Sequence, residues 1–369
     1  TVFCRMEVHY SNGKYSRLFF TLLALIMPPL AAAKPSAMFV FGDSLVETGN
    51  NNFLQSIARS NFMPYGIDFS SGPTGRFSNG KTFVDFLCDF MDLRYPPPFA
   101  DPKTKGSRLF DGVNYASAAA GILNETGRHY GERFNLRDQV ANFKSTLNKL
   151  DNENVGTNMS SYLANSIAIM VIGSNDYINN YLMPSLYSSG YNYSPSDFAT
   201  LLLNTFSMQL LKLYNLGLRK FFVAGVGPLG CLPIERIQGQ SPATRCVNRV
   251  NQMLGRFNIG LRSLVEQMNN RAGAAVAYGN TYGAMGDILN NPSTYGFGVI
   301  NRGCCGIGKK VGQVICLPFV VPCQNRSGYV FWDAYHPTEA VNAILAQWAF
   351  SGPQARAYPI NVQMMTAIK

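Results

Sequence analysis

The sequence predicts an α/β fold in which a mainly parallel sheet carries helices on both faces. Short runs of β-branched and aromatic residues alternate with longer segments whose apolar residues recur at helical spacing. The apolar runs are continuous, as strands buried on both faces require, and such strands belong to parallel sheets between two helical layers. The 369 residues contain no internal repeat, low-complexity linker or shift in composition, so we expect a single domain over residues 34–369.

Five runs supply the predicted strands, of which the second is the weakest: residues 38–41, 113–117, 167–172, 221–226 and 274–278. Five segments have helical periodicity: residues 82–91, 135–150, 198–216, 248–269 and 337–350. Gly217 follows the third of these segments and Pro337 opens the last, and both residues are typical helix-end signals. Ligands bind beyond the carboxyl ends of parallel strands, so we expect functional residues there.

Residues 1–33 have the composition of a secretory signal peptide. Lys14 and Arg17 precede an apolar stretch over residues 18–30, and three alanines ending at Ala33 provide the small residues that a signal peptidase needs. We therefore expect cleavage near Ala33 and a secreted, extracellular protein. The apolar stretch is short for a transmembrane helix, which favours a signal peptide. An N-terminal membrane anchor is the alternative. No later apolar run approaches ~18 residues, so we expect no transmembrane segment.

The cysteines are spaced for disulfides in an extracellular protein. Cys231 and Cys246 are placed to close one surface loop. Two more bridges, whose pairing the sequence leaves open, are expected among Cys304, Cys305, Cys316 and Cys323. A metal site is the alternative for these four, but no histidine lies near them, so we expect no metal. Cys88 lies on an apolar helical face and is predicted to be a buried thiol.

The formal net charge is +10, and the basic residues are scattered rather than clustered. A solvated surface is the simplest interpretation, while contact with an acidic cell-wall or cuticle matrix such as pectin is the electrostatic alternative. No nucleic-acid-binding motif occurs, so nucleic acid is excluded as a partner. Four triplets fit the N-glycosylation pattern, at Asn124, Asn158, Asn192 and Asn325. The third is the weakest because Pro195 follows it.

Only three histidines occur in the chain, which narrows the choice of a catalytic base. His9 lies in the predicted signal peptide, which leaves His129 and His336. The first predicted strand ends in a small turn that contains Ser44, and a serine hydroxyl becomes a good nucleophile when an imidazole takes its proton. We predict that His336 is this base. His129, in a loop-like Gly-Arg-His-Tyr segment, is the alternative.

Four segments that follow predicted strands or precede the last helix supply the parts of an ester-cleaving site. Ser44 is the predicted nucleophile, and Asp333, three residues before His336, is predicted to hold the far ring nitrogen. Backbone N–H groups of Ser44 and Gly121 and the side-chain amide of Asn175 are the predicted oxyanion donors. The structural alternatives are a turn or helix-capping role for Ser44, a helix cap for Asp333 and a turn for Asn175. The combination is more specific than any one part.

The same segments resemble the sequence blocks of the GDSL esterase/lipase family, in the secreted plant branch of the SGNH hydrolase superfamily. The resemblance covers nearly all of residues 34–369 and is carried by FGDSLVETGNNN at 41–52, PTGRFSNG at 73–80, GVNYASAAAG at 112–121, GSNDY at 173–177, GCCG at 303–306 and DAYHP at 333–337. It implies a flavodoxin-like three-layer α/β/α sandwich with a five-stranded sheet, and ester hydrolysis without metal or cofactor in the cell-wall space. The resemblance also assigns the four residues whose one-letter codes give the SGNH superfamily its name, which are Ser44, Gly121, Asn175 and His336 here.

Two positions depart from the family pattern. Residues 118–120 are alanines where many relatives carry glycines, which leaves the choice between Gly121 and Ala118 as oxyanion donor open. Glu47 stands where the family often has Asp, and we expect little effect on the chemistry.

The predicted activity is hydrolysis of carboxylic esters or acyl lipids through an acyl-enzyme on Ser44. The alternatives are an extracellular acyltransferase of the cutin-forming kind that uses the same site, a catalytically dead secreted binding protein and, from fold alone, a flavin carrier. Four aromatic residues are candidates to line an acyl groove, with core packing as the alternative: Phe53, Tyr177, Tyr181 and Phe331.

Overall fold

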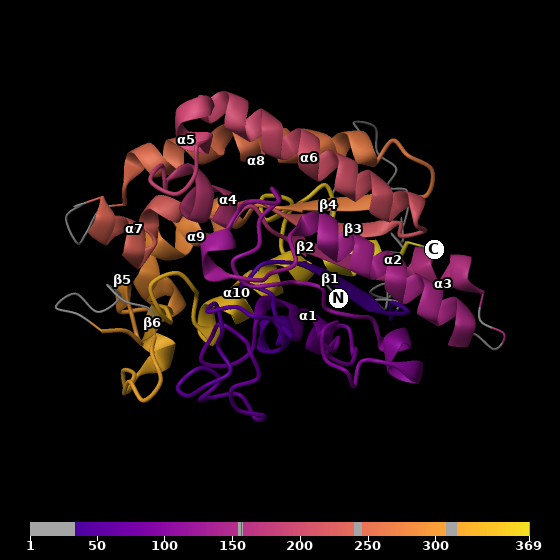
Figure 1. The fold of residues 1–369 in the computed structure, drawn as a ribbon, viewed down its shortest axis with the longest axis horizontal. Coiled ribbons are helices and arrows are strands. Elements are labelled where there is room, and N and C mark those ends of the chain that lie inside the picture. Colours follow the sequence, from indigo (N-terminus) through magenta and orange to yellow (C-terminus); the bar gives the residue numbers. More distant parts are fainter. Residues whose placement is uncertain (1–33, 154–155, 157, 240–245, 308–315, 369) are drawn as a thin grey trace, which may run out of the picture. The chain divides into compact units, whose positions relative to one another are not determined.

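The computed structural model describes residues 34–153, 156, 158–239, 246–307 and 316–368, so the predicted signal peptide lies outside the described residues. The central sheet has five strands in the order β1-β2-β3-β4-β7 (Figure 1). They are β1 Met38–Gly42, β2 Ile167–Val171, β3 Lys220–Ala224, β4 Ala275–Gly279 and β7 Ala357–Tyr358. Strands β1 to β4 are parallel and β7 is antiparallel to β4, which confirms the predicted, mainly parallel sheet.

The predicted strand over residues 113–117 is wrong. The segment lies along the free edge of β1, where a flavodoxin-like sheet places its second strand, but it forms only isolated bridges, from Asn114 to Val40 and to Pro98. The next rung of a parallel ladder would need Gly42 N–H to donate to Tyr115 O, but this N–H donates to Gln139 Oε1 at 2.8 Å instead, although Ser117 N–H still donates to Gly42 O. The fifth strand is instead β7, whose two residues are too few for a periodic pattern.

Alternate residues of the strands face two hydrophobic clusters, one on each side of the sheet. In β1, Phe39 and Phe41 pack into the first cluster, and Met38 and Val40 pack into the second. The first side carries α2 Leu136–Glu153, α3 Met159–Asn165, α6 Pro195–Asn215 and α8 Asn248–Met268. The second carries α1 Phe83–Phe90, α10 Glu339–Ser351 and α11 Val362–Thr366. Figure 1 shows α6 and α8 on one side of the sheet and α1 and α10 on the other, as the three-layer prediction requires.

The five predicted helices are present as α1, α2, α6, α8 and α10, with ends shifted by a few residues. A separate two-stranded parallel sheet is formed by β5 Val299–Gly303 and β6 Tyr329–Phe331. Pro337 precedes α10 rather than opening it, because Pro337 still bridges to Phe331 and Thr338 donates to Val330 O at 3.0 Å.

The shorter helices are α4 Ser174–Asp176, α5 Ser189–Asn192, α7 Pro233–Gln238 and α9 Thr281–Asn290, with a π-helical turn η4 Tyr177–Tyr181. The 3₁₀ turns are η1 Asn50–Phe53, η2 Gly106–Asp111, η3 Arg128–Tyr130, η5 Leu229–Cys231, η6 Pro292–Tyr295 and η7 Arg326–Gly328.

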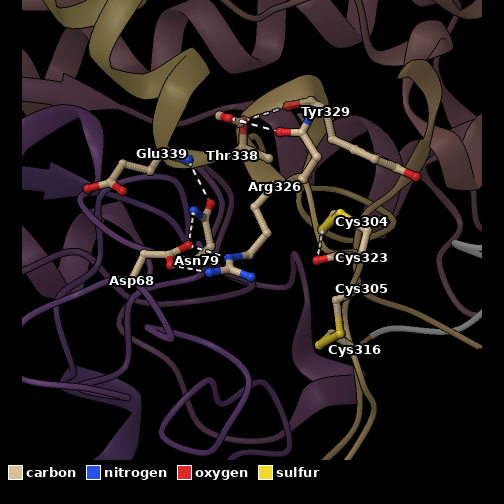
Figure 2. The surroundings of a disulfide bond; sticks show 12 residues. Asp68, Asn79, Cys304, Cys305, Cys316, Cys323, Arg326, Tyr329, Thr338 and Glu339 are labelled. Carbon is tan, nitrogen blue, oxygen red and sulfur yellow. Dashed lines mark hydrogen bonds and ion pairs between the residues drawn. A yellow bond between two sulfur atoms is a disulfide. The ribbon is translucent and has the colours of Figure 1, made fainter. Parts of the chain in front are cut away.

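Three disulfides join Cys231 to Cys246, Cys304 to Cys323 and Cys305 to Cys316. The last two lie close together (Figure 2). The expected loop and the two bridges of the four-cysteine cluster are thus confirmed, and the metal alternative is excluded for these four residues. Cys88 is the free cysteine among the described residues, and its side chain is buried. No helix in the described part of the chain is long and apolar enough to cross a membrane.

Candidate active site

The three predicted catalytic side chains form one chain of contacts at the carboxyl ends of the strands. Ser44 lies in the turn after β1, and Asp333 and His336 lie between β6 and α10. Ser44 Oγ is 2.8 Å from His336 Nε2, although the two residues are 292 positions apart. On the other side of the ring, His336 Nδ1 is 2.8 Å from Asp333 Oδ2 and 2.9 Å from Asp333 Oδ1.

Asp333 is fully buried, and several donors hold its carboxylate. Its Oδ1 accepts the backbone N–H groups of Tyr335 and His336, each at 2.8 Å. Burial raises the pKa of Asp333, but the charge of His336 and the hydrogen bonds together outweigh burial and lower this pKa below its usual value. Asp333 is therefore an anion that keeps the Nδ1 proton between the two side chains and turns Nε2 toward Ser44.

Tyr65 is a site residue that the sequence does not reveal. Its hydroxyl donates to Asp333 Oδ2 at 2.6 Å, and its side chain is buried. Burial and the nearby Asp333 charge raise the pKa of Tyr65 well above its usual value, so the hydroxyl stays a donor. Its ring packs edge-on against Phe77 and Trp332. No motif marks Tyr65, because it lies 268 positions before its partner in a segment without helix or strand periodicity.

Polar contacts fix the segment after Tyr65 to the chain on both sides of the catalytic loop (Figure 2). The Arg326 guanidinium donates to both carboxylate oxygens of Asp68 at 2.6 Å. Asn79 donates to Asp68 Oδ2 at 2.8 Å and accepts the backbone N–H of Glu339 at 2.9 Å. The hydrogen bond from Arg326 lowers the pKa of Asp68 below its usual value. The two ends of the loop that carries Asp333 and His336 are thus anchored to one segment, residues 68–79.

Asn175 lies in α4, beyond the end of β2, and lines the cavity beside Ser44. Its Oδ1 accepts from Asn179 Nδ2 at 2.6 Å, and its own Nδ2 donates to Ala120 O at 2.9 Å. A primary amide has two N–H donors, so the second remains for a ligand. Within the described residues, the backbone N–H groups of Ser44 and of Ala119, another cavity residue, also have no hydrogen-bond partner.

Gly121, the predicted backbone donor, is not among the residues that line the cavity. A Cβ on Gly121 would lie 2.6 Å from Asp176 Oδ1, so this glycine allows close packing of two segments behind the cavity. Ala119 lines the cavity instead and has a φ of +63°, in a region that favours glycine. The N–H of Ala118, the other candidate, is already donated to the Glu47 carboxylate at 2.6 Å.

Three buried carboxyl groups hold the strand-end segments together around Ser44. Glu47 and Asp176 each accept two backbone N–H groups. Asp43 accepts Leu45 N–H at 3.0 Å through Oδ1, and its buried Oδ2 has no partner within the described residues. Burial raises the pKa of Asp43 to about 7, that of Glu47 to about 8 and that of Asp176 to about 6. Their positions within the motif segments are the only sequence signal for this structural role.

A cavity of about 410 Å³ opens beside Ser44 and His336, and this volume is in the range of small-molecule sites. Phe331 lines it, as predicted. The prediction is wrong for the other three aromatic residues. Phe53 is half exposed and does not line the cavity, and Tyr177 and Tyr181 are buried in the hydrophobic cluster on the first side of the sheet.

The alternative base, His129, is engaged elsewhere. Its Nδ1 is 2.7 Å from the Tyr187 hydroxyl, and its ring packs against Tyr130. Burial and the charge of Arg133 lower the pKa of His129 below its usual value. Within the described part of the chain, no group of three or more His, Cys, Asp or Glu side chains is placed to hold a metal ion.

A contacting Ser, His and Asp at the strand ends of a three-layer α/β/α domain is an arrangement typical of hydrolases. The family model of the GDSL-like Lipase/Acylhydrolase matches residues 38–349. The chain is 56% identical over 368 residues to GDSL esterase/lipase At1g71250 of Arabidopsis thaliana, which covers 99% of this chain and 98% of that protein. It is 51% identical over 337 residues to GDSL esterase/lipase At5g08460 of the same plant, which covers 90% of this chain and 88% of that protein.

The chain therefore belongs to the GDSL esterase/lipase family. It is a hydrolase that acts on ester bonds.

Proposed function

We propose that the protein hydrolyses carboxylic esters, including acyl lipids, through an acyl-enzyme on Ser44. The observation that supports this is the unbroken contact from Ser44 Oγ through His336 to Asp333, beside an apolar cavity. His336 Nε2 takes the Ser44 proton as Oγ attacks the acyl carbon, and then gives it to the leaving alcohol. Water repeats the two steps, which releases the acid and restores Ser44. Asp333 stabilises the imidazolium that forms in each step.

The negative charge that develops on the acyl oxygen is stabilised by three donors: Ser44 N–H, Ala119 N–H and the free Asn175 amide hydrogen. This assignment is supported because all three are uncommitted within the described residues and belong to cavity-lining residues. Ala119 replaces Gly121 in this role, since a backbone N–H can serve whatever the side chain. Asn175→Ala is expected to lower kcat by ~10²–10³.

The decisive variants are Ser44→Ala and His336→Ala, which are expected to reduce p-nitrophenyl ester turnover to near background while circular dichroism and Tm stay near the wild type. His129→Ala is the matched control, since its imidazole contacts Tyr187 rather than Ser44, and it should keep its activity. A fluorophosphonate probe should label Ser44. Retained turnover in Ser44→Ala would overturn the proposal, and a folded wild type that neither reacts with the probe nor hydrolyses esters would be a binding protein.

Product analysis separates hydrolysis from acyl transfer at the same acyl-enzyme. With a monoacylglycerol of a hydroxy acid as substrate, the proposed hydrolase releases free acid and glycerol. Oligomeric products would show that a substrate hydroxyl, rather than water, is the main acceptor, and would overturn hydrolysis as the principal reaction.

We also infer that the protein is secreted and glycosylated. Three disulfides support an oxidising compartment, and the sequence of residues 1–33 supports a cleaved leader. The four triplet asparagines are all exposed: Asn124, Asn158, Asn192 and Asn325. Protein from plant culture medium should start near residue 34 and lose mass with an N-glycosidase, whereas an intact leader on unglycosylated intracellular protein would contradict the inference. Salt-dependent retention on pectin tests the predicted contact with an acidic wall matrix.

A further inference from the structure

The cavity extends past the catalytic side chains along the ends of the strands. Ser44 follows β1, Asn175 follows β2, Gly227 follows β3 and Thr281 opens α9 after β4, and all four residues line it. Neighbouring strands lie about 4.8 Å apart, so three intervals separate the two ends of this row by about 14 Å. The cavity is therefore a channel along the rim of the sheet rather than a pit above Ser44.

One wall of this channel is a single face of α9. Thr281, Met285 and Leu289 line the cavity at intervals of four residues, which places them above one another on one side of the helix. Met285 and Leu289 are buried and belong to the same hydrophobic cluster as Phe331. Eight residues of helix span about 12 Å, so the wall is nearly as long as the row of strand ends.

The two ends of the channel differ in polarity. Toward α9, Thr281 is followed by side chains that are all apolar: Leu232, Met285, Leu289, Phe331 and Leu345. The other end has Arg59, Tyr130 and Asn179, next to Ile57, whose residue surface is 74% exposed. A polar or charged group loses hydration at the α9 end without a charged partner among these residues, whereas water reaches it at the other end.

We propose that the acyl chain of the ester lies in the arm of the channel along α9, and that Met285 and Leu289 set the longest straight chain that the enzyme accepts. The alcohol part then lies toward Arg59 and Tyr130. This assignment rests on the proposed function, because it takes an acyl group bound at Ser44 as its starting point. The substrates are accordingly esters of unbranched medium-chain acids, with an alcohol part that tolerates polar groups.

The test measures kcat/KM for p-nitrophenyl esters from acetyl to hexadecanoyl. The wild type should prefer medium chains over acetyl and hexadecanoyl, because each added methylene gains apolar contact until the chain meets the far wall. Leu289→Ala should move the preferred length to longer chains. Met285→Trp should lower the ratio of kcat/KM for dodecanoyl ester to kcat/KM for butyryl ester roughly tenfold or more.

Ile288→Ala is the matched control for Leu289→Ala. Ile288 is the preceding residue of the same helix and is fully buried, but it does not line the cavity. We expect this control to lower Tm and leave the preferred chain length unchanged. The assignment is overturned if the preferred length stays fixed in both cavity variants, or if Ile288→Ala shifts it as much as Leu289→Ala does.

Labelling of Ser44 by fluorophosphonates with short and long alkyl chains provides a second readout, which also serves if Met285→Trp does not fold. Leu289→Ala should accelerate labelling by the longer probe relative to the shorter one. Failure of the proposed function has a different signature, in which the wild type hydrolyses no ester and Ser44 is not labelled by either probe. Normal hydrolysis and labelling with an unchanged length preference would overturn the α9 assignment alone.

Discussion

The nucleophile side and the base side of the site are held by different kinds of interaction. Ser44 continues directly from β1, and the Gln139 side chain fixes the end of that strand by bonding both Gly42 N–H and Gly42 O at 2.8 Å. His336 lies on a loop outside the central sheet, beside two disulfides and an ion pair. The difference indicates that buried hydrogen bonds suffice to place a residue at a strand end, whereas this loop has covalent and charged constraints in addition to its hydrogen bonds.

The disulfide segment acts on the base side through direct backbone contacts. Cys304 and Cys305 donate their N–H groups to Phe331 O at 3.0 Å and Trp332 O at 2.6 Å. Trp332 N–H in turn donates to His336 O at 2.8 Å. A shift of the disulfide segment is therefore expected to move the catalytic loop and to leave the turn of Ser44 in place.

Asp333→Asn tests the centre of the base side and has the largest expected effect. The new amide would present an N–H to His336 Nδ1, favour the wrong tautomer and remove the buried anion, so we expect kcat to fall by ~10⁴. Steady-state kinetics with a p-nitrophenyl ester measures the loss, and circular dichroism checks that the fold is intact. A kcat within tenfold of the wild type would show that Asp333 does not orient the base.

Replacing both Cys305 and Cys316 by Ser removes a constraint from the base side alone. Loss of this disulfide is expected to lower the free energy of unfolding by ~3 kcal/mol. It should also lower kcat at temperatures well below Tm, because the Cys305 N–H donates to the backbone of the loop that carries His336. The matched control replaces Cys231 and Cys246, which close a loop of similar length. We expect a comparable fall in Tm in the control with kcat retained. Equal losses of kcat in the two variants would refute a specific link between the cluster and the base.

The two sides are expected to respond to pH in opposite directions. Burial raises the pKa of Glu47 from 4.5 to about 8, so the folded protein holds a proton that the unfolded chain releases between these values. The contribution of Glu47 to the free energy of unfolding is therefore fully present below about pH 4.5. It decreases as the pH rises to about 8, by at most ~1.4 kcal/mol per pH unit. Asp333 and Asp68 have lowered pKa values, so their stabilisation is present above about pH 3.8 and is lost as the pH falls further.

Glu47→Gln separates these contributions, because glutamine cannot titrate. The slope of Tm against pH between about pH 4.5 and pH 8 should become shallower in this variant, although the loss of one acceptor for a backbone N–H lowers Tm throughout. Thermal melts at several pH values measure both effects. A slope equal to that of the wild type in this range would assign the pH dependence to another group.

Tyr65→Phe removes a donor from the base side without changing the ring packing. A hydrogen bond to a charged group contributes about 1.5–3 kcal/mol to stability, so we expect the free energy of unfolding, and with it Tm, to fall. Without the hydrogen bond from Tyr65, the negative charge of Asp333 interacts more strongly with the His336 imidazolium and stabilises it better. The acid limb of the kcat/KM profile should therefore move to higher pH. Tyr95→Phe is the matched control, since Tyr95 also donates to an aspartate, Asp89, but away from the site. A purely structural role would lower Tm and leave the pH profile in place.

The sequence predicts which side chains meet at the candidate site but not the contacts that hold them. Ser44 and His336 can be predicted because imidazoles are scarce in this chain and because both residues flank predicted strands or helices. Asp333 follows from its position three residues before His336. Tyr65 cannot be predicted in this way, since its contact joins segments 268 positions apart and depends on tertiary packing.

The same limit explains the wrong strand prediction and the open choice of the backbone oxyanion donor. Residues 113–117 have the composition of a strand, but the Gly42 N–H that would continue the pairing with them is donated to the Gln139 side chain. A backbone N–H carries no signature in the residue type, so the choice among Ala118, Ala119 and Gly121 depends on backbone angles and on which N–H already has a partner. Whether residues 113–117 pair as a strand and which backbone N–H faces the cavity both depend on the folded conformation. Sequence periodicity indicates only average preferences of residue types.

Ala119→Gly has the smallest expected effect and sharpens the description of the nucleophile side. An L-residue in the left-handed region is strained, while glycine costs more entropy on folding, so the net gain in stability is roughly 0.5–1 kcal/mol. The backbone N–H remains, so kcat should be unchanged while Tm rises slightly. A fall in Tm would mean that the buried Ala119 methyl makes packing contacts that outweigh the strain. A large fall in kcat would mean instead that the alanine fixes the direction of the N–H, because glycine leaves the same donor free to turn away.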